Sequence, residues 1–253
     1  MCTALIAAPR CGRSPVLKLG PPLLRDGAGR RSAAREALRT VATGGRAVVV
    51  VSAVAGQTDG LLAHARDLSR APGSALLAAL LRTGEEASAA LMGMALLEAG
   101  VHAHVLAADE IDVRTRGPLD DGEPVGADFE RLRAALRAHA VVVVAGFVGR
   151  HAWGAPSLRG RGGSGLTALF LGAGLGAAEV RLVKDVPGVL PRDPRTAAGP
   201  QRPLEATTWE EVERIGSGVV QPKALRFAAA EGLEFTVAGV GGGGTRVGRG
   251  APS

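Results

Sequence analysis

The sequence predicts an α/β domain built around a mostly parallel sheet. Two runs of valine, at residues 48–51 and 141–144, are too apolar to face water on either side, as is typical of strands inside a parallel sheet. Segments with apolar residues at helical spacing lie between such runs, and loops rich in small residues follow several of them. Alternating strands and helices connect by right-handed crossovers, which gather the loops, and any ligand, at the carboxyl ends of the strands.

In the first half of the chain the elements alternate as this fold requires. We expect strands at residues 15–19, 46–54 and 101–107 and helices at residues 23–42, 61–68, 73–82, 85–99 and 129–139. In the helix over 85–99 we expect four apolar side chains to pack inward, those of Leu91, Met94, Leu96 and Leu97. Residues 109–128 hold turn residues and no long apolar run, which predicts a hairpin or lid over a site.

The second half continues the alternation less regularly. A strand at residues 140–145 leads through a glycine-rich loop to a helix at 166–178, which three glycines weaken by roughly 1 kcal/mol each. We then expect a strand at 179–183, an irregular crossing at 192–203, helices at 208–215 and 219–231, and a strand at 234–238. Residues 1–14 are predicted to be a disordered lead-in and residues 241–253 a disordered Gly-rich tail.

The composition places the chain among globular proteins. Its 253 residues, 46% of them apolar, can bury a full core in one large domain or in two lobes that share a sheet. No apolar run approaches the roughly 20 residues of a membrane-spanning helix, and residues 4–8 are short for the core of a signal peptide. Cys2 and Cys11 are the only cysteines, too few for a disulfide framework or a cysteine zinc site. We therefore expect a cytoplasmic protein with no membrane partner.

The net charge of +6 raises the question of nucleic acid. The basic residues are nearly all arginines scattered from end to end, and aromatic residues make up only 3% of the chain, so stacking platforms for bases are lacking. We expect no nucleic-acid partner. A surface of this kind still attracts small anions.

The loop with the most chemical content lies at residues 157–168 and contains Gly160-Arg161-Gly162-Gly163-Ser164-Gly165. A strand that breaks into such a loop and then opens a helix brings backbone N–H groups and the positive end of the helix dipole together, which favours an anion. Arg161 adds a planar fork of donors that suits a carboxylate or a phosphate. By itself the loop also fits a flexible surface segment of a Gly-rich, Arg-rich chain.

A series of motifs in order along the chain resembles the aspartate kinase branch of the amino acid kinase family. They are residues 16–20 (VLKLG), 51–59 (VSAVAGQTD), 83–85 (TGE), 146–149 (GFVG), 160–164 (GRGGS), 184–189 (KDVPGV) and 193–195 (DPR). The resemblance implies the family fold, a three-layer sandwich around the mostly parallel central sheet. It places a kinase domain at residues 15–240, with an acceptor-binding lobe at about 15–160 and a nucleotide-binding lobe at about 161–240.

For the nucleotide, the resemblance implies polar residues at the strand ends. Lys18 and Asp185 would be catalytic, with Lys18 reaching the phosphates of ATP, and the other cofactor-binding residues would be Gly20, Lys184, Gly188, Asp193 and Arg195. No metal ligand is expected from the protein, because Mg²⁺ would arrive bound to ATP. From the residues alone, Lys18 also fits a solvated lysine at a strand end, and Asp185 fits a turn or a cap.

For the acceptor, an amino acid needs a carboxylate to meet its ammonium group and a cation to meet its carboxylate. The resemblance gives these two roles to Glu85 and Arg161, with Ser52, Thr58 and Ser164 as further substrate-binding residues. Without the resemblance, Glu85 fits a residue favoured by the dipole at a helix N-terminus, and Ser52 and Thr58 fit loop caps.

The chain departs from the family pattern at several functional positions. Pro21 stands where the family has a second glycine and removes a backbone donor to the phosphates. Gly165 stands where an aspartate normally follows the Gly-Arg-Gly-Gly-Ser loop, and Gly218 and Gln221 replace a lysine and a histidine. In related kinases the aspartate is thought to orient the catalytic lysines, so these losses are correlated. Lys223 would substitute for the lysine only if the following helix started elsewhere.

Three functions fit these observations. The first is ATP-dependent phosphorylation of the side-chain carboxylate of L-aspartate to an acyl phosphate, the entry to lysine, threonine and methionine synthesis in this family. The second is a catalytically impaired homologue that binds nucleotide or amino acid or serves as a regulatory subunit. The third is a kinase for another carboxylate, a carbamate or a nucleotide, because fold does not fix substrate. The family implies a homodimer, and without its ligand-sensing domains we expect no feedback control from this chain alone.

Overall fold

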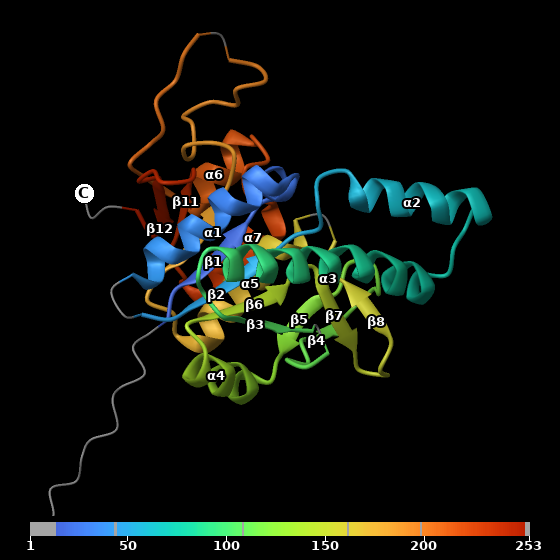
Figure 1. The fold of residues 1–253 in the computed structure, drawn as a ribbon. Helices are drawn as coiled ribbons and strands as arrows, with labels where there is room; N and C mark the ends of the chain where they lie inside the picture. The colour runs from blue at the N-terminus through green and yellow to red at the C-terminus, as the bar shows by residue number, and fades with distance from the viewer. Residues whose placement is uncertain (1–13, 43–44, 108, 161, 198, 251–253) are drawn as a thin grey trace, which may run out of the picture.

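The computed structural model describes residues 14–42, 45–107, 109–160, 162–197 and 199–250. Among them a central eight-stranded sheet has the strand order β10-β12-β11-β9-β1-β2-β6-β3 (Figure 1). Its strands are β1 (Val16–Leu19), β2 (Ala47–Val51), β3 (Ala103–Leu106), β6 (Val141–Ala145), β9 (Val180–Val183), β10 (Ala206–Thr208), β11 (Phe235–Ala238) and β12 (Thr245–Gly248). Every neighbouring pair is parallel except β11 and β12, so the predicted mostly parallel sheet is confirmed.

The two faces of this sheet are covered by different helices because successive strand residues point to opposite sides. Val49 and Val51 belong to one core cluster, and Val48 and Val50 belong to another. The first cluster includes α1 (Gly27–Val41) and α3 (Ser74–Glu98); the second includes α4 (Phe129–Ala138), α5 (Gly163–Leu175), α6 (Trp209–Ile215) and α7 (Pro222–Glu231). The chain therefore folds as the three-layer sandwich that the family resemblance implied.

A smaller four-stranded sheet lies beside the main body, in the order β5-β4-β7-β8. It consists of β4 (Arg114–Arg116), β5 (Glu123–Gly126), β7 (Val148–His151) and β8 (Pro156–Leu158). β4 and β5 pair in antiparallel fashion, which confirms the hairpin predicted within residues 109–128. α3 packs against β7 and β8 and so joins the two sheets.

The long helix α3 differs from its prediction. We expected two helices that meet near Gly84, but Ser74–Glu98 form one helix, because packing against α2 (Gln57–Leu68) and the sheets outweighs the roughly 1 kcal/mol that a glycine costs. The continuous helix sets its own inner face, which carries Glu85, Ala89, Met92 and Leu96. Leu96 is buried as expected, but the inward packing of the other three was wrong: Leu91 is 37%, Met94 64% and Leu97 54% exposed.

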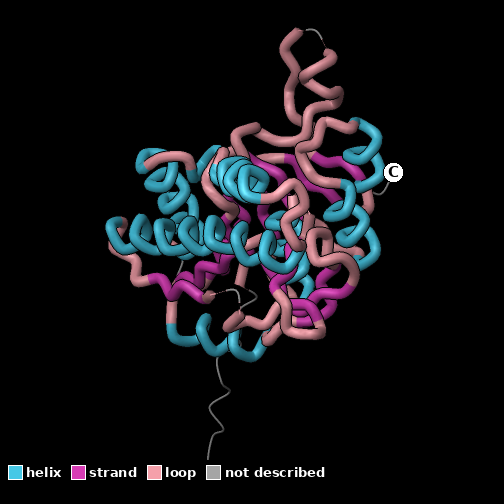
Figure 2. Tube along the Cα trace, turned by 90° about the vertical axis from the view of Figure 1, so that its right-hand side faces the viewer, coloured by secondary structure: helices cyan, strands magenta, loops and turns pink. Residues whose placement is uncertain are grey.

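The ends of the chain also differ from expectation. We expected residues 241–253 to be disordered, but Thr245–Gly248 form β12, where Thr245 and Val247 are buried between β10 and β11. The predicted lead-in, residues 1–14, lies outside the described residues except for Ser14. The segment between β9 and β10 projects from the body of the molecule (Figures 1 and 2). None of the described helices has the length and apolar character needed to cross a membrane.

Candidate active site

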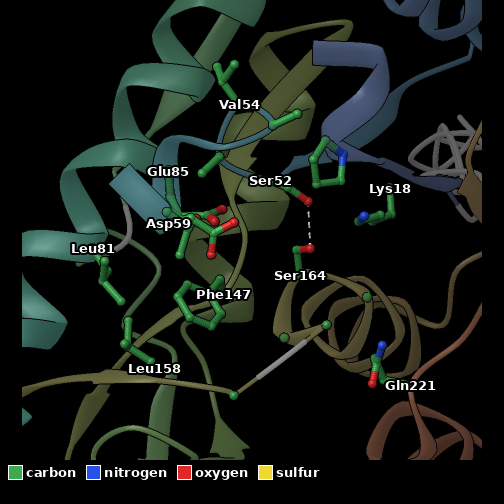
Figure 3. Close-up of a pocket in the computed structure, with 18 of the residues that line it drawn as sticks. Lys18, Ser52, Val54, Asp59, Leu81, Glu85, Phe147, Leu158, Ser164 and Gln221 are labelled. Carbon is green, nitrogen blue, oxygen red and sulfur yellow. Dashed lines mark hydrogen bonds between the residues drawn. The ribbon is translucent and has the colours of Figure 1, made fainter. Parts of the chain in front are cut away.

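The carboxyl ends of four adjacent strands, β9, β1, β2 and β6, meet at one edge of the main sheet. A cavity of about 660 Å³ lies there, large enough for a small-molecule substrate. Its wall includes Lys18 within β1, Glu85 on α3, Ser164 on the first turn of α5, and the polar residues Ser52, Thr58, Asp59, Asp120, Lys184 and Gln221 (Figure 3). Parallel sheets bind ligands at this edge because the loops and helix N-termini converge there.

Two lysines enter the cavity from neighbouring strands. Lys18 is only 5% exposed, and burial, aided by Lys184, lowers its pKa to about 7, against the opposing pull of Glu85 and Asp185. Lys184 follows β9, and burial lowers its pKa as well, with Asp185 opposing. A buried lysine beside a half-buried one concentrates unfavourable positive charge. The site therefore gains from any ligand that brings negative charge to Lys18 and Lys184.

Glu85 provides a carboxylate in the same cavity. It is 3% exposed, and its Oε2 has no hydrogen-bond partner among the described residues. Burial raises the pKa of Glu85 to about 8, while a hydrogen bond from the backbone of Ala53 and the charges of Lys18 and Arg159 pull it down. A ligand with an ammonium group would favour the charged form of this carboxylate.

Two serine hydroxyls connect the sheet to the helix that carries the glycine-rich loop. Ser52 follows β2 and Ser164 lies in the first turn of α5, and their Oγ atoms are 2.7 Å apart. In Figure 3 this pair lies between Lys18 on one side and Glu85 with Asp59 on the other. The hydroxyls are therefore placed between the cationic and the anionic parts of the cavity.

Small residues allow these elements to meet. A Cβ at Gly146, just after β6, would lie 2.5 Å from Cβ of Ser164 and 2.7 Å from the carbonyl oxygen of Val51. Gly162 caps α5 with a φ of 73°, and its Cα faces Gln221 so closely that a side chain would overlap it. Phe147, in the cavity wall, also has a positive φ, of 65°, a strained backbone of the kind that functional sites hold.

The glycine-rich loop opens α5 onto the cavity as the sequence predicted. Gly160, Gly162, Gly163, Ser164 and Gly165 all line it. The helix dipole places partial positive charge at this end of α5. Arg161, to which the resemblance gives the carboxylate of the acceptor, lies outside the described residues.

Comparison with known proteins identifies the relatives of this fold and site. Residues 14–238 match the amino acid kinase family. This chain belongs to the amino acid kinase family. It is similar to aspartate kinase Ask_LysC of Stutzerimonas stutzeri, 37% identical over 193 residues that cover 75% of this chain and 47% of the relative. It is 36% identical over 197 residues to the aspartokinase of Geobacillus stearothermophilus, covering 77% of this chain and 48% of that protein. The chain thus spans about half the length of these curated relatives.

Solved structures of aspartate kinases share the fold. The aspartate kinase of Synechocystis matches 94% of this chain with a TM-score of 0.80 and 32% identity, and the match covers 40% of that protein. The E. coli aspartokinase III, solved in complex with aspartate and ADP, matches 95% of this chain with a TM-score of 0.80, covering 65% of that protein, at 23% identity. At that identity the second match speaks for the fold alone.

Several residues to which the family resemblance gave a role lie away from the cavity wall. Asp185 acts on Lys18 and Lys184 through its charge. Asp193 and Arg195 pair with each other at 2.6 Å in the projecting segment, while Gly188 packs against β12, where a Cβ would lie 2.5 Å from Oγ1 of Thr245. Gly20 donates its N–H to the carbonyl oxygen of Val183 and thereby fixes the turn after Lys18. The roles given to these residues stay predictions.

The departures from the family pattern occupy open positions. Pro21 and Pro22 begin the 3₁₀ helix η1 (Pro21–Leu24) and line the cavity. A Cβ at Gly165 or Gly218 would meet no atom within 4 Å, although Gly218 has a φ of 72° that disfavours any other residue. A Cβ would therefore have room at both positions.

Sequence reasoning missed two features near the site. Arg159, which precedes the glycine-rich loop, is fully buried. Lys223, at the start of α7, donates to Asp121 Oδ1 at 2.7 Å and to the carbonyl oxygens of Asp121 and Gly122, and so fastens the β4–β5 hairpin to α7. The alternation of apolar and charged residues could suggest neither the burial of Arg159 nor the contacts of Lys223, because both depend on segments that are distant in the sequence.

The described residues bring together no group of three or more His, Cys, Asp or Glu side chains able to hold a metal ion. Of the histidines, His104 stacks on His139 with ring centroids 4.7 Å apart, and His151 packs on Trp153. None of the five histidines lines the cavity.

Proposed function

We propose that this chain is the catalytic part of an aspartate kinase, which transfers the γ-phosphoryl group of ATP to the side-chain carboxylate of L-aspartate. The observation that carries the proposal is that one cavity holds the buried carboxylate of Glu85, the buried Lys18 and the half-buried Lys184. The names of the relatives and their 36–37% identity to this chain support it. The division into an acceptor lobe at about 15–160 and a nucleotide lobe at about 161–240 belongs to the same proposal.

On the acceptor side, Glu85 would bind the α-ammonium group of aspartate. The ammonium group stabilises the ionised carboxylate and so relieves the cost of burying it. Ser52, Thr58 and Ser164 would orient the substrate through their hydroxyl groups. The α-carboxylate is assigned to Arg161 through the resemblance alone.

On the donor side, Lys18, Lys184 and the N-terminus of α5 would hold the phosphates. Phosphoryl transfer requires alignment and cationic stabilisation of the transferring group more than covalent help. An oxygen of the aspartate side chain attacks the γ-phosphorus, the bond to the β,γ-bridging oxygen breaks, and ADP leaves. Because the attacking carboxylate is already ionised, no general base is needed. Mg²⁺ would enter with ATP, held mainly by phosphates and water.

Further parts of the proposal follow from the family and not from the cavity. They are entry into lysine, threonine and methionine synthesis, a cytoplasmic location and a homodimer. A kinase for a different carboxylate would use the same donor side, so the acceptor has to be tested directly.

The test is ADP release from Mg-ATP with and without L-aspartate, in the presence of hydroxylamine, which traps an acyl phosphate as its hydroxamate. We expect hydroxamate that depends on aspartate, and at least a hundredfold lower kcat/KM in Glu85→Gln, because that variant cannot pair with the ammonium group. ATP binding by Glu85→Gln, followed by calorimetry, should stay unchanged. A folded wild-type protein that binds ATP but forms no hydroxamate would contradict the proposal and favour the impaired homologue.

A further inference from the structure

Arg159 is a buried arginine whose charge the proposed reaction does not use. It is 0% exposed, and its Nε and Nη2 have no hydrogen-bond partner among the described residues. Removing a cation from water costs several kcal/mol unless other groups compensate for it. A negative charge near Arg159 would therefore offset part of the free-energy cost of burying it.

The surroundings of Arg159 hold it in one place beneath the glycine-rich loop. Its N–H donates to the carbonyl oxygen of Phe147 at 3.0 Å, and its Nη1 donates to Oγ1 of Thr167 at 2.6 Å. Thr167 in turn donates to the carbonyl oxygen of Gly163 and accepts from the N–H of Phe147. A Cβ at Gly163 would lie 2.7 Å from that of Arg159, so the arginine is packed directly against the first turn of α5.

The negative charge that acts on Arg159 is that of Glu85. Arg159 directly follows β8, and α3, which carries Glu85, packs on β8. Burial lowers the pKa of Arg159 to about 9, and Glu85 opposes this change; reciprocally, Arg159 pulls down the pKa of Glu85, which burial raises to about 8.

Among the described residues, Lys18 is the other cation that acts on Glu85, but its charge is not constant. Its pKa near 7 means that it gains and loses a proton close to neutral pH, and in the proposed reaction the phosphates engage it. Arg159 stays charged through this range. Of the two cations, Arg159 is the one that gives Glu85 a fixed positive neighbour whether or not nucleotide is bound.

Arg161 lies outside the described residues, and among those that the structure describes few other charges face Glu85. Asp59 of α2 lies beside it in the cavity wall (Figure 3). Five other ionisable side chains on α3 and the elements packed against it engage neighbours elsewhere: Arg82 (Glu86 and Asp109), Glu36 (Arg39), His104 (His139), Arg150 (Asp112) and His151 (Trp153).

We propose that Arg159 is a positioning residue that sets the charge of Glu85 and thereby the pH range in which the acceptor binds. The inference rests on the proposed function, because it takes Glu85 as the group that meets the ammonium of the acceptor. Only ionised Glu85 binds that group. A change that raises the proton affinity of Glu85 therefore weakens acceptor binding below the pKa of Glu85 and leaves it unchanged above.

The test compares Arg159→Gln, which loses the charge but keeps a donor for Thr167, with Arg159→Lys, which keeps the charge. The pKa of the Glu85 carboxyl is read by ¹³C NMR, with Glu85→Gln to assign the signal, and KM for L-aspartate and ATP is measured from pH 6 to 9. In Arg159→Gln we expect the pKa of Glu85 to rise by about one unit and KM for aspartate to rise about tenfold at pH 7, because one pKa unit is a factor of ten. KM for ATP should not change, and Arg159→Lys should keep the wild-type profile.

Three results would overturn the inference. One is an unchanged pKa of Glu85 in folded Arg159→Gln, and another is an equal loss of aspartate affinity at every pH. If Arg159→Gln does not fold, Arg159→Lys decides: a folded Arg159→Lys protein that loses aspartate binding at all pH values while Glu85 titrates normally shows a purely structural role. Because the NMR titration needs no turnover, it tests Arg159 even if the wild-type protein forms no hydroxamate, which would contradict only the proposed function.

Discussion

The two faces of the first turn of α5 differ in how closely they are packed. On one face, a Cβ at Gly163 would lie 2.7 Å from Cβ of Arg159 and 2.8 Å from Cδ2 of Phe147. On the other, a Cβ at Gly165 would meet no atom within 4 Å. The first face packs on Arg159 and Phe147, whereas the second is open toward the cavity that also holds Lys18 and Lys184.

This difference distinguishes positions where packing requires a glycine from positions where packing would accept a larger residue. Gly146 and Gly163 stand where a larger side chain would push strand and helix apart. The family resemblance places charged side chains at Gly165 and Gly218, where a Cβ would meet no atom within 4 Å. Glycine at these two positions therefore lacks the expected charge and relieves no close contact.

The largest effect on stability should come from adding one methyl group where β6 packs against the first turn of α5. Gly146→Ala places a Cβ 2.5 Å from Cβ of Ser164 and 2.7 Å from the carbonyl oxygen of Val51, so we expect it to lower the free energy of unfolding by about 1–3 kcal/mol. Gly165→Ala is the matched control, because it fills open space within a helix and should stabilise by up to about 1 kcal/mol. Urea unfolding measures both. Equal effects of the two substitutions would remove the distinction between the faces.

A smaller effect, on turnover, is expected from a charged side chain at Gly165, on the open face of α5. Gly165→Asp puts a carboxylate into the cavity with Lys18 and should raise the pKa of that lysine, which burial lowers to about 7. Lys18 would then stay protonated at higher pH, so turnover should increase by up to about tenfold at pH 8 and change little at pH 6.

The control for that variant is Gly165→Asn, which has the same size and no charge. Hydroxamate formation at both pH values compares the two. Equal turnover in the aspartate and asparagine variants would mean that the absence of a charge at position 165 does not limit the reaction.

The smallest effect on stability is expected from breaking the contact between the β4–β5 hairpin and α7. Lys223 is partly exposed and Asp121 largely so, so Lys223→Met should lower the free energy of unfolding by at most about 1 kcal/mol, and less at high salt. Lys18→Met removes a lysine that lines the cavity and forms no ion pair among the described residues, so its effect should not follow that salt dependence. Urea unfolding at two salt concentrations checks both variants. A loss of several kcal/mol in Lys223→Met would show that the hairpin is essential to the fold.

Much of the site could be predicted from the sequence because its residues follow the strands directly. Lys18 lies in a short apolar strand, and Ser52 and Lys184 each come just after one, so the strand pattern places them at one edge of the sheet. Glu85 and Ser164 were assigned through motifs, and both line the cavity. Asp193 and Arg195 were assigned in the same way but lie in the projecting segment, whose path no local pattern indicates.

The apolar pattern alone predicts the mostly parallel sheet and the edge at which the site lies, because burial of apolar residues with a period of two or 3.6 is a local property of the chain. Three features emerge only in the folded chain: residues 74–98 form one helix, Thr245–Gly248 complete the sheet, and Arg159 acts on Glu85. Each of these depends on packing between segments far apart in the sequence. A glycine in a helix, a Gly-rich terminus or a buried arginine has a cost that only its neighbours in space can offset.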